Sequence, residues 1–323
     1  MDKLRLFSRL LFYIILHIPS RRTGERLTKG SICAIIFGCC RTCGSKFCGG
    51  CREERRKMKS RGTPIKTVYY RDELSDEFSE AVITPKKIDG SYRYLRRGFF
   101  ARLAHIFFYR VIAIPLALCY LKLKFWHRIE GKEKLRPYKK TARFIYGNHT
   151  QPTADALIPT FITHPENAYV IVHPANVSMP VLGRVTPYIG ALPLPDGLAA
   201  VKNFNSALDT LVSSGSPVYI YPEAHIWPYY TGIRPFADRS FMYPVKYGAP
   251  VFCFTNVYKK RKHGKSPTIV TYIDGPFFPD KALPRDKARE ALRCRVLSAM
   301  RERAALSDCE YIRYLPVADE RKI

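Results

Sequence analysis

Short apolar runs alternate with helical periodicity from residue 142 to the end of the chain. The apolar runs are rich in β-branched and aromatic residues, as buried strands are, and they lie at 142–149, 167–174, 217–223, 250–258 and 268–275. Apolar side chains recur at helical spacing in residues 197–215, where Gly215 can cap the end, and again in residues 285–306 after Pro284. Strands that alternate with helices predict an α/β fold with a mostly parallel central sheet flanked by helices.

Residues 97–124 carry a longer apolar stretch of helical character. Its longest uncharged run is the eleven residues 111–121, which lie between Arg110 and Lys122 and contain Pro115. A helix that spans a bilayer needs about 20 apolar residues, so we expect that this segment does not cross a membrane as one straight helix. A basic, aromatic-rich apolar segment suits a membrane interface, and an ordinary core helix is the alternative.

The first 66 residues differ in composition from the rest of the chain. They contain 16 Lys and Arg against 4 Asp and Glu, together with six of the ten cysteines, all between Cys33 and Cys51. Closely spaced cysteines beside basic residues leave a structural zinc site and acylation at a membrane open, and a basic tail with spare thiols is the simplest interpretation. We expect a disordered extension over residues 1–66, a polar linker with membrane-interfacial helices over 67–126, and the α/β domain over 127–323.

Net charge narrows the class of partner. The chain has 54 Lys and Arg against 27 Asp and Glu, a net charge of +27, which indicates a nucleic acid or an anionic membrane surface. No helix-turn-helix, zinc-finger or RNA-recognition signature is present, which favours membrane phospholipids and predicts no nucleic-acid partner. The other four cysteines are scattered singly, as free thiols are in a reducing compartment. We therefore expect a peripheral or monotopic membrane protein on the cytoplasmic face.

Polar residues that follow two of the predicted strands are the candidates for chemistry. His149 comes directly after the first strand, Glu223 comes shortly after the third, and Asp155 begins the helix that follows His149. Ligands of parallel sheets bind beyond the carboxyl ends of the strands, and a His with a nearby carboxylate is a general base. The alternatives are that Asp155 only caps a helix and that His149 is only hydrogen-bonded.

No nucleophile accompanies this pair of residues. The sequence contains no G-x-S-x-G elbow, no glycine-rich phosphate loop and no H-E-x-x-H zinc helix. A base without a protein nucleophile has to activate a hydroxyl or a water that the substrate brings. The residues alone therefore indicate general-base chemistry on a substrate hydroxyl.

Three blocks resemble the glycerolipid acyltransferase family that includes the lysophosphatidic acid acyltransferases. They are N-H-T-Q-P-T-A-D at 148–155, Y-P-E-A-H at 221–225 and the segment 233–251, and the resemblance covers roughly residues 95 to 280. It implies an O-acyltransferase with His149 and Asp155 as catalytic residues and with Asn148 and Glu223 in the substrate site. It also implies acyl-CoA or acyl carrier protein as the donor, a lysophospholipid such as lysophosphatidic acid as the acceptor, and neither a cofactor nor a metal.

The chain departs from the family pattern at two places. Five residues rather than four separate His149 from Asp155, so the pair forms only if the loop bulges. The two arginines that the family associates with the acceptor phosphate are absent, and His225 stands near one of those positions as a neutral donor. Other cations that lie close to the blocks are candidates for the phosphate contact: Arg234, Arg239 and Arg184. These departures keep two alternatives open, a catalytically dead family member that acts as a membrane-bound scaffold and a basic nucleic-acid-binding protein.

Overall fold

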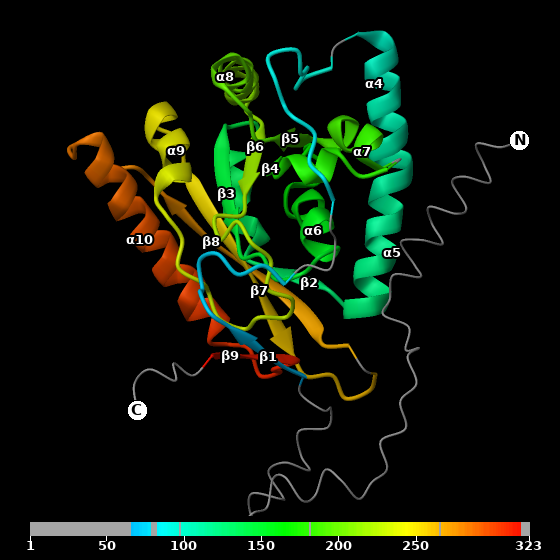
Figure 1. Cartoon of the computed structure of the whole chain (residues 1–323), viewed down its shortest axis with the longest axis vertical. Coiled ribbons are helices and arrows are strands. Elements are labelled where there is room, and N and C mark those ends of the chain that lie inside the picture. The colour runs from blue at the N-terminus through cyan, green and yellow to red at the C-terminus, as the bar shows by residue number, and fades with distance from the viewer. Residues whose placement is uncertain (1–65, 79–82, 97, 181, 265, 318–323) are drawn as a thin grey trace, which may run out of the picture. The chain divides into compact units, whose positions relative to one another are not determined.

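A computed structural model describes residues 66–78, 83–96, 98–180, 182–264 and 266–317 (Figure 1). These residues belong to one compact unit that begins at Thr63. The cysteine cluster between Cys33 and Cys51 lies outside the described residues, as does almost all of the predicted extension. The zinc and acylation alternatives therefore stay predictions.

A seven-stranded sheet forms the centre of the described part of the chain, in the order β2-β8-β7-β3-β6-β4-β5. Neighbouring strands are parallel except in the β7–β8 hairpin, which confirms the mostly parallel sheet. All five predicted strands are present, and the two that the sequence pattern missed, β2 and β5, have three residues each, too few to show a period. The strands are β2 (Arg128–Glu130), β3 (Arg143–Gly147), β4 (Tyr169–Val172), β5 (Ala191–Pro193), β6 (Pro217–Ile220), β7 (Val251–Lys259) and β8 (Thr268–Phe277).

Helices cover both faces of this sheet because the strands are apolar on both faces. On one face, Phe144 and Tyr146 of β3 share a core with α8 (Leu198–Ser213) and α10 (Arg285–Ala304). On the other face, Ile145 shares a core with α5 (Ile114–Phe125) and α6 (Ala154–Thr163). Figure 1 shows these two helices on the side of the sheet away from α10. The remaining helices are short: α7 (Leu182–Val185), α9 (Met242–Tyr247), and the 3-10 helices η2 (Lys132–Tyr138), η3 (Pro174–Val177), η4 (Thr186–Ile189) and η5 (Arg239–Phe241).

Residues 99–125 form one continuous helix, in agreement with the helical character predicted for residues 97–124, and Pro115 does not interrupt it. It consists of α4 (Phe99–His105), a π-helical stretch η1 (Ile106–Ala113) and α5, and by length and composition it is long and apolar enough to cross a membrane. Pro115 stands at the second residue of α5, directly after the π-helical stretch. The changed hydrogen-bond register there accommodates a residue without an N–H, so the helix continues.

One side of this long helix is attached to the domain. Tyr109, Ala117, Leu121 and Phe125 are buried, and the Tyr109 hydroxyl lies 3.3 Å from Thr160 Oγ1 of α6. The opposite side exposes large apolar side chains from one end of the helix to the other: Phe99, Phe100, Leu103, Ile106, Phe107, Val111, Leu118 and Leu123. The helix therefore lies lengthwise on the domain and leaves an uncovered apolar face.

The segment predicted as a polar linker is part of the folded unit. Strand β1 (Lys66–Tyr70) pairs in parallel with β9 (Ile312–Pro316) in a separate two-stranded sheet. Ile88 and Tyr94 are 1% and 4% exposed and belong to the core that α8 and α10 share. The sequence pattern missed this because single apolar residues among polar ones have no period, although tertiary packing buries them.

Candidate active site

The structure brings His149 and Asp155 together in spite of the longer spacing. Strand β3 ends at Gly147, His149 follows at the carboxyl edge of the sheet, and Asp155 stands in the first turn of α6. His149 Nδ1 donates to Asp155 Oδ2 at 2.9 Å. The Asp155 side chain is buried, whereas a quarter of the His149 side chain is exposed. The loop therefore presents a His–Asp dyad whose imidazole is accessible.

The additional loop residue is accommodated because the loop wraps around the carboxylate. The backbone N–H groups of Thr150 and Gln151 both donate to Asp155 Oδ2 at 2.8 Å. Asn256 Nδ2 donates to Asp155 Oδ1 at 3.1 Å. With His149, four donors fix the orientation of this buried carboxylate, which in turn fixes the imidazole with Nδ1 as the donor.

A chain of buried polar side chains supports the dyad from beneath. Thr271 Oγ1 of β8 donates to Asn256 Oδ1 of β7 at 2.7 Å, and His127 Nε2 lies 2.8 Å from the same hydroxyl. Burial lowers the pKa of His127 to about 4, so its imidazole is neutral at pH 7. None of these three residues was among the candidates predicted from the sequence. The only available signal was a pair of polar residues, Thr255 and Asn256, inside the apolar run 250–258.

Asn148 connects the dyad loop to β7. Its Oδ1 accepts from Asn256 N at 2.7 Å and its Nδ2 donates to Asn256 O at 3.1 Å, which continues the β3–β7 pairing beyond Gly147. A Cβ at Gly147 would lie 2.1 Å from the Phe254 ring, so only glycine permits this approach. Both ends of the Asn148 amide are occupied, and the predicted direct contact with substrate is therefore not supported.

Glu223 and Arg234 form a buried ion pair next to the dyad. Glu223 Oε2 is 3.5 Å from Arg234 Nε and 3.5 Å from the backbone nitrogen of His149, and neither side chain of the ion pair has exposed surface. Burial raises the pKa of Glu223 to about 7, against the opposing effect of the Arg234 charge. A buried carboxyl that titrates near neutrality therefore lies beneath the His149 backbone.

The burial of Arg234 corrects its predicted role. Its guanidinium donates to the carbonyl of Glu73 at 3.2 Å, to that of Glu223 at 3.2 Å and to that of His225, and it lies over the Trp227 ring. With its donors inside the protein, the side chain holds the 223–225 loop to residues 73–77 and does not reach an acceptor phosphate. Sequence proximity to the third block could not reveal this burial.

The other candidates for substrate binding are dispersed. His225 Nδ1 pairs with Glu77 Oε2 at 2.8 Å, in the segment that precedes α4. Arg239 is exposed at the start of η5, and Arg184 is exposed in α7. Among the described residues, neither arginine contacts His149 or Asp155. Their roles at an acceptor phosphate stay predictions.

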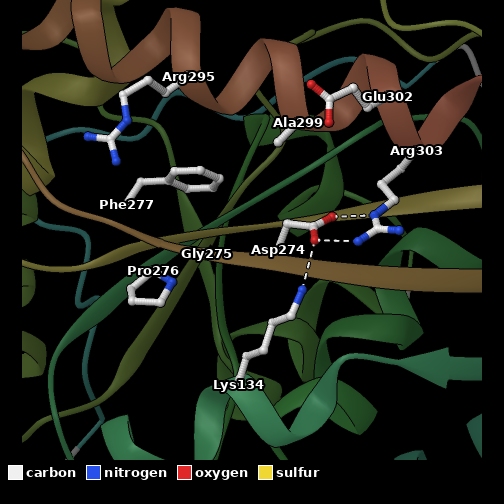
Figure 2. A pocket seen from close by; sticks show the side chains of 9 residues that line it. All are labelled: Lys134, Asp274, Gly275, Pro276, Phe277, Arg295, Ala299, Glu302 and Arg303. Atoms are coloured by element: carbon white, nitrogen blue, oxygen red, sulfur yellow. Dashed lines mark hydrogen bonds and ion pairs between the residues drawn. The ribbon is translucent and has the colours of Figure 1, made fainter.

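Figure 2 shows a cavity of about 370 Å³ that is separate from the dyad. It lies between β8 and α10, and its central group is Asp274, which pairs with Lys134 at 2.8 Å and with Arg303 at 2.7 Å. Its two inner cations therefore share one carboxylate as their ion-pair partner. Within the described ranges, no cluster of three His, Cys, Asp or Glu side chains is placed to hold a metal ion.

Of three comparisons with known proteins, only the comparison with solved structures found a match. No family model matches the chain, and no curated protein matches it. Among solved structures, the fold resembles that of the 1-acyl-sn-glycerophosphate (LPA) acyltransferase PlsC from Thermotoga maritima, with 18% sequence identity and a TM-score of 0.43. The similarity covers 62% of this chain and 78% of the bacterial chain, and it concerns the fold.

Proposed function

We propose that this protein is a membrane-associated O-acyltransferase that moves a fatty acyl group from a thioester to the hydroxyl of a lysophospholipid. The observation that carries the proposal is the His149–Asp155 pair, with its 2.9 Å hydrogen bond and its enclosed carboxylate. The motif at 148–155 is the block in which the resembled family has its general base. A dyad without an adjacent serine or cysteine nucleophile suits direct transfer to a substrate hydroxyl.

The geometry assigns the ring nitrogens of His149 to different tasks. Nδ1 is held by Asp155, and among the described residues no group hydrogen-bonds to Nε2, so Nε2 is the base. It takes the proton of the acceptor hydroxyl as that oxygen attacks the thioester carbonyl carbon, and Asp155 stabilises the imidazolium. When the C–S bond breaks, the imidazolium returns the proton to the thiolate. The products are an ester and a free thiol, with acyl-CoA or acyl carrier protein as the donor.

The long helix supports a position in one leaflet. Its buried stripe, from Tyr109 to Phe125, holds it against the domain along most of its length. A helix attached in this way cannot span a bilayer unless the domain enters the hydrocarbon as well, and a folded polar surface there is prohibitively costly. The exposed apolar face is free to enter the interface instead. We therefore propose a monotopic protein whose helix lies in the plane of the cytoplasmic leaflet.

Thioester turnover by the full chain tests the proposed function. Release of free thiol from acyl-CoA is measured in vesicles that carry lysophosphatidic acid, a second lysophospholipid or an uncharged hydroxyl lipid. Replacing His149 with Ala is expected to lower kcat by ~10²–10⁴-fold, because the acceptor loses its base. His263→Ala, which changes an exposed histidine of the β7–β8 hairpin, is the matched control and should leave turnover unchanged.

Two outcomes would contradict the proposal. Turnover by the His149→Ala variant within a few-fold of the wild type would remove His149 as the base. Absence of wild-type turnover with every donor and acceptor, in a protein that binds vesicles and unfolds cooperatively, would favour the catalytically dead scaffold.

A further inference from the structure

A second cavity, of about 290 Å³, lies at the edge of the sheet opposite the dyad. Its floor includes Tyr169 and Ala191, the first residues of β4 and β5. These strands run parallel to β6, which runs parallel to β3, so their first residues lie at the amino edge, whereas His149 follows the carboxyl end of β3. The cavity is therefore not part of the proposed acyl-transfer site.

Every charged side chain that lines this cavity, among the described residues, is a cation. Arg96 and Arg102 are exposed arginines on its rim, and neither has an acidic ion-pair partner within the described ranges. Arg96 Nη1 donates to the Tyr188 hydroxyl at 3.1 Å and its guanidinium lies over the Tyr188 ring, so this arginine is held at the cavity. Two positive charges without an acidic partner, one of them held in place, favour an anionic ligand.

Two residues that line the cavity, Tyr94 and His105, each have a buried polar atom without a hydrogen-bond partner. The Tyr94 hydroxyl belongs to a residue that is only 4% exposed and has no partner. His105 Nδ1 donates to the Tyr188 carbonyl at 2.5 Å, and its Nε2 is buried without a partner. Buried polar groups are ordinarily hydrogen-bonded, because an unsatisfied group costs free energy. A ligand with several acceptor oxygens would satisfy the Tyr94 hydroxyl, and it would satisfy His105 Nε2 when the imidazole is doubly protonated and both of its nitrogens donate.

The cavity adjoins the uncovered face of the long helix. Ala101, Arg102 and His105 of α4 line the cavity, while Phe100 and Leu103 on the same turns are 81% and 54% exposed. Aromatic and aliphatic side chains that enter a lipid interface would bring the adjacent arginines to the depth of the headgroups. The ligand chemistry that fits this location is a phosphate carried by a membrane lipid.

We propose that this cavity, lined by Tyr94, Arg96, Arg102 and His105, binds the phosphate of an anionic phospholipid headgroup. The two arginines bind the phosphate oxygens, and the Tyr94 hydroxyl donates to one of them. The site is regulatory or orienting with respect to the membrane, since it is at the opposite edge from His149. It uses the proposed placement of the helix in one leaflet, but it does not depend on acyl transfer.

Vesicle partitioning of the full chain tests the site. Binding is measured by co-sedimentation with vesicles of phosphatidylcholine alone and of phosphatidylcholine with a minor fraction of phosphatidic acid. The double variant Arg96→Gln/Arg102→Gln is expected to bind phosphatidic acid vesicles about a hundredfold more weakly, with unchanged binding to neutral vesicles. The control Lys281→Gln/Arg285→Gln removes the same net charge from exposed positions around the start of α10 and should change binding less than about threefold.

A single-atom variant separates the site from general charge. Tyr94→Phe removes a hydroxyl that has no partner in the protein, so the free energy of unfolding should be unchanged or raised. Binding to phosphatidic acid vesicles is expected to weaken at least about tenfold, which corresponds to the loss of one hydrogen bond to a charged group. Tighter or equal binding by this variant would overturn the role of Tyr94 and of the buried site.

The remaining outcomes also decide the proposal. Equal loss in the cavity variant and the α10 control would show that net charge alone drives vesicle binding, and the site would be rejected. Calorimetry with inorganic phosphate distinguishes the two sources of phosphate. If the arginine variant abolished phosphate binding but left partitioning to phosphatidic acid vesicles unchanged, the cavity would bind a soluble phosphate and the headgroup assignment would be wrong.

Discussion

Replacing Asp155 with Asn tests the dyad more finely than removing His149, because the hydrogen-bond network determines how the amide must lie. Thr150 and Gln151 direct two N–H groups at the Oδ2 position, so an oxygen must stay there. The new NH₂ group then faces Asn256 Nδ2, which is also a donor. Rotation of the Asn256 amide relieves this conflict.

The chain beneath the dyad can follow that rotation. After it, Asn256 donates to Thr271 Oγ1, and the Thr271 hydroxyl reverses to donate to His127 Nε2. His127 is neutral, because burial lowers its pKa to about 4, so its proton can occupy the other ring nitrogen. The amides of residues 155 and 256 and the Thr271 hydroxyl stay paired, and we expect Asp155→Asn to cost no more than about 1 kcal/mol of unfolding free energy.

The rate should fall although His149 keeps its hydrogen bond. The variant loses the negative charge 2.9 Å from the imidazolium that forms during proton transfer. Opposite charges in contact near a protein surface attract by about 4 kcal/mol, and the partial exposure of His149 reduces this. A loss of about 3 kcal/mol corresponds to a decrease in kcat of roughly a hundredfold.

The measurement combines kcat from thioester release with urea unfolding, and Asp155→Ala serves as the contrast. Alanine leaves the N–H groups of Thr150 and Gln151 without an acceptor, so it should lose about 3 kcal/mol or more of stability. An Asn variant with kcat within threefold of the wild type would show that the carboxylate charge is not used. An Asn variant as unstable as the Ala variant would refute the reasoning about the network.

Three further predictions concern the groups around the site. Between pH 4.5 and 7 Glu223 binds more protons in the folded protein than in the unfolded chain, so its contribution to stability falls as pH rises. Glu223→Gln should remove about 3 kcal/mol of that decline, and parallel profiles of urea stability against pH for the variant and the wild type would contradict this prediction. Arg234→Met should lower the unfolding free energy by about 3–5 kcal/mol at pH 8, because it leaves the buried Glu223 carboxylate unpaired. A raised KM for the acceptor at unchanged stability would instead support the predicted phosphate contact. On the exposed face of the long helix, the double variant Phe100→Ser/Leu103→Ser should reduce vesicle binding at unchanged stability, whereas Leu121→Ala on the buried face should cost about 2–5 kcal/mol of stability at unchanged vesicle binding. Equal effects from variants on the two faces would reject the interfacial orientation.

Local periodicity was sufficient for five of the seven strands of the central sheet. The five apolar runs became β3, β4, β6, β7 and β8, and α8 and α10 follow their predicted apolar stripes. These elements are predictable because buried strands and amphipathic helices repeat their apolar residues within a few positions. The same rule failed for residues 66–96, where the outcome depends on a distant partner strand and on packing against the core.

The dyad was predictable in part. His149 and Asp155 stand in one block of sequence, and the position of His149 after an apolar run placed it at the carboxyl edge of the sheet. Whether the five-residue spacing brings the two side chains together depends on backbone N–H groups that turn toward the carboxylate. The amino-acid sequence of the loop does not show in which direction these N–H groups point.

By itself, the sequence determined the fold class, the position of His149 at the carboxyl edge of the sheet, and the pairing of His149 with a carboxylate as a hypothesis, because each depends on neighbours within a few residues. Only the tertiary structure decided the surroundings of Arg234 and Asn148, which the sequence placed in the substrate site, and of Asn256, which it left unassigned. Arg234 and Asn148 are enclosed and bind other parts of the chain, and Asn256 joins Asp155 from a strand 101 residues away. Burial and long-range pairing arise when distant segments pack together, and a local pattern carries no information about which distant segment that will be.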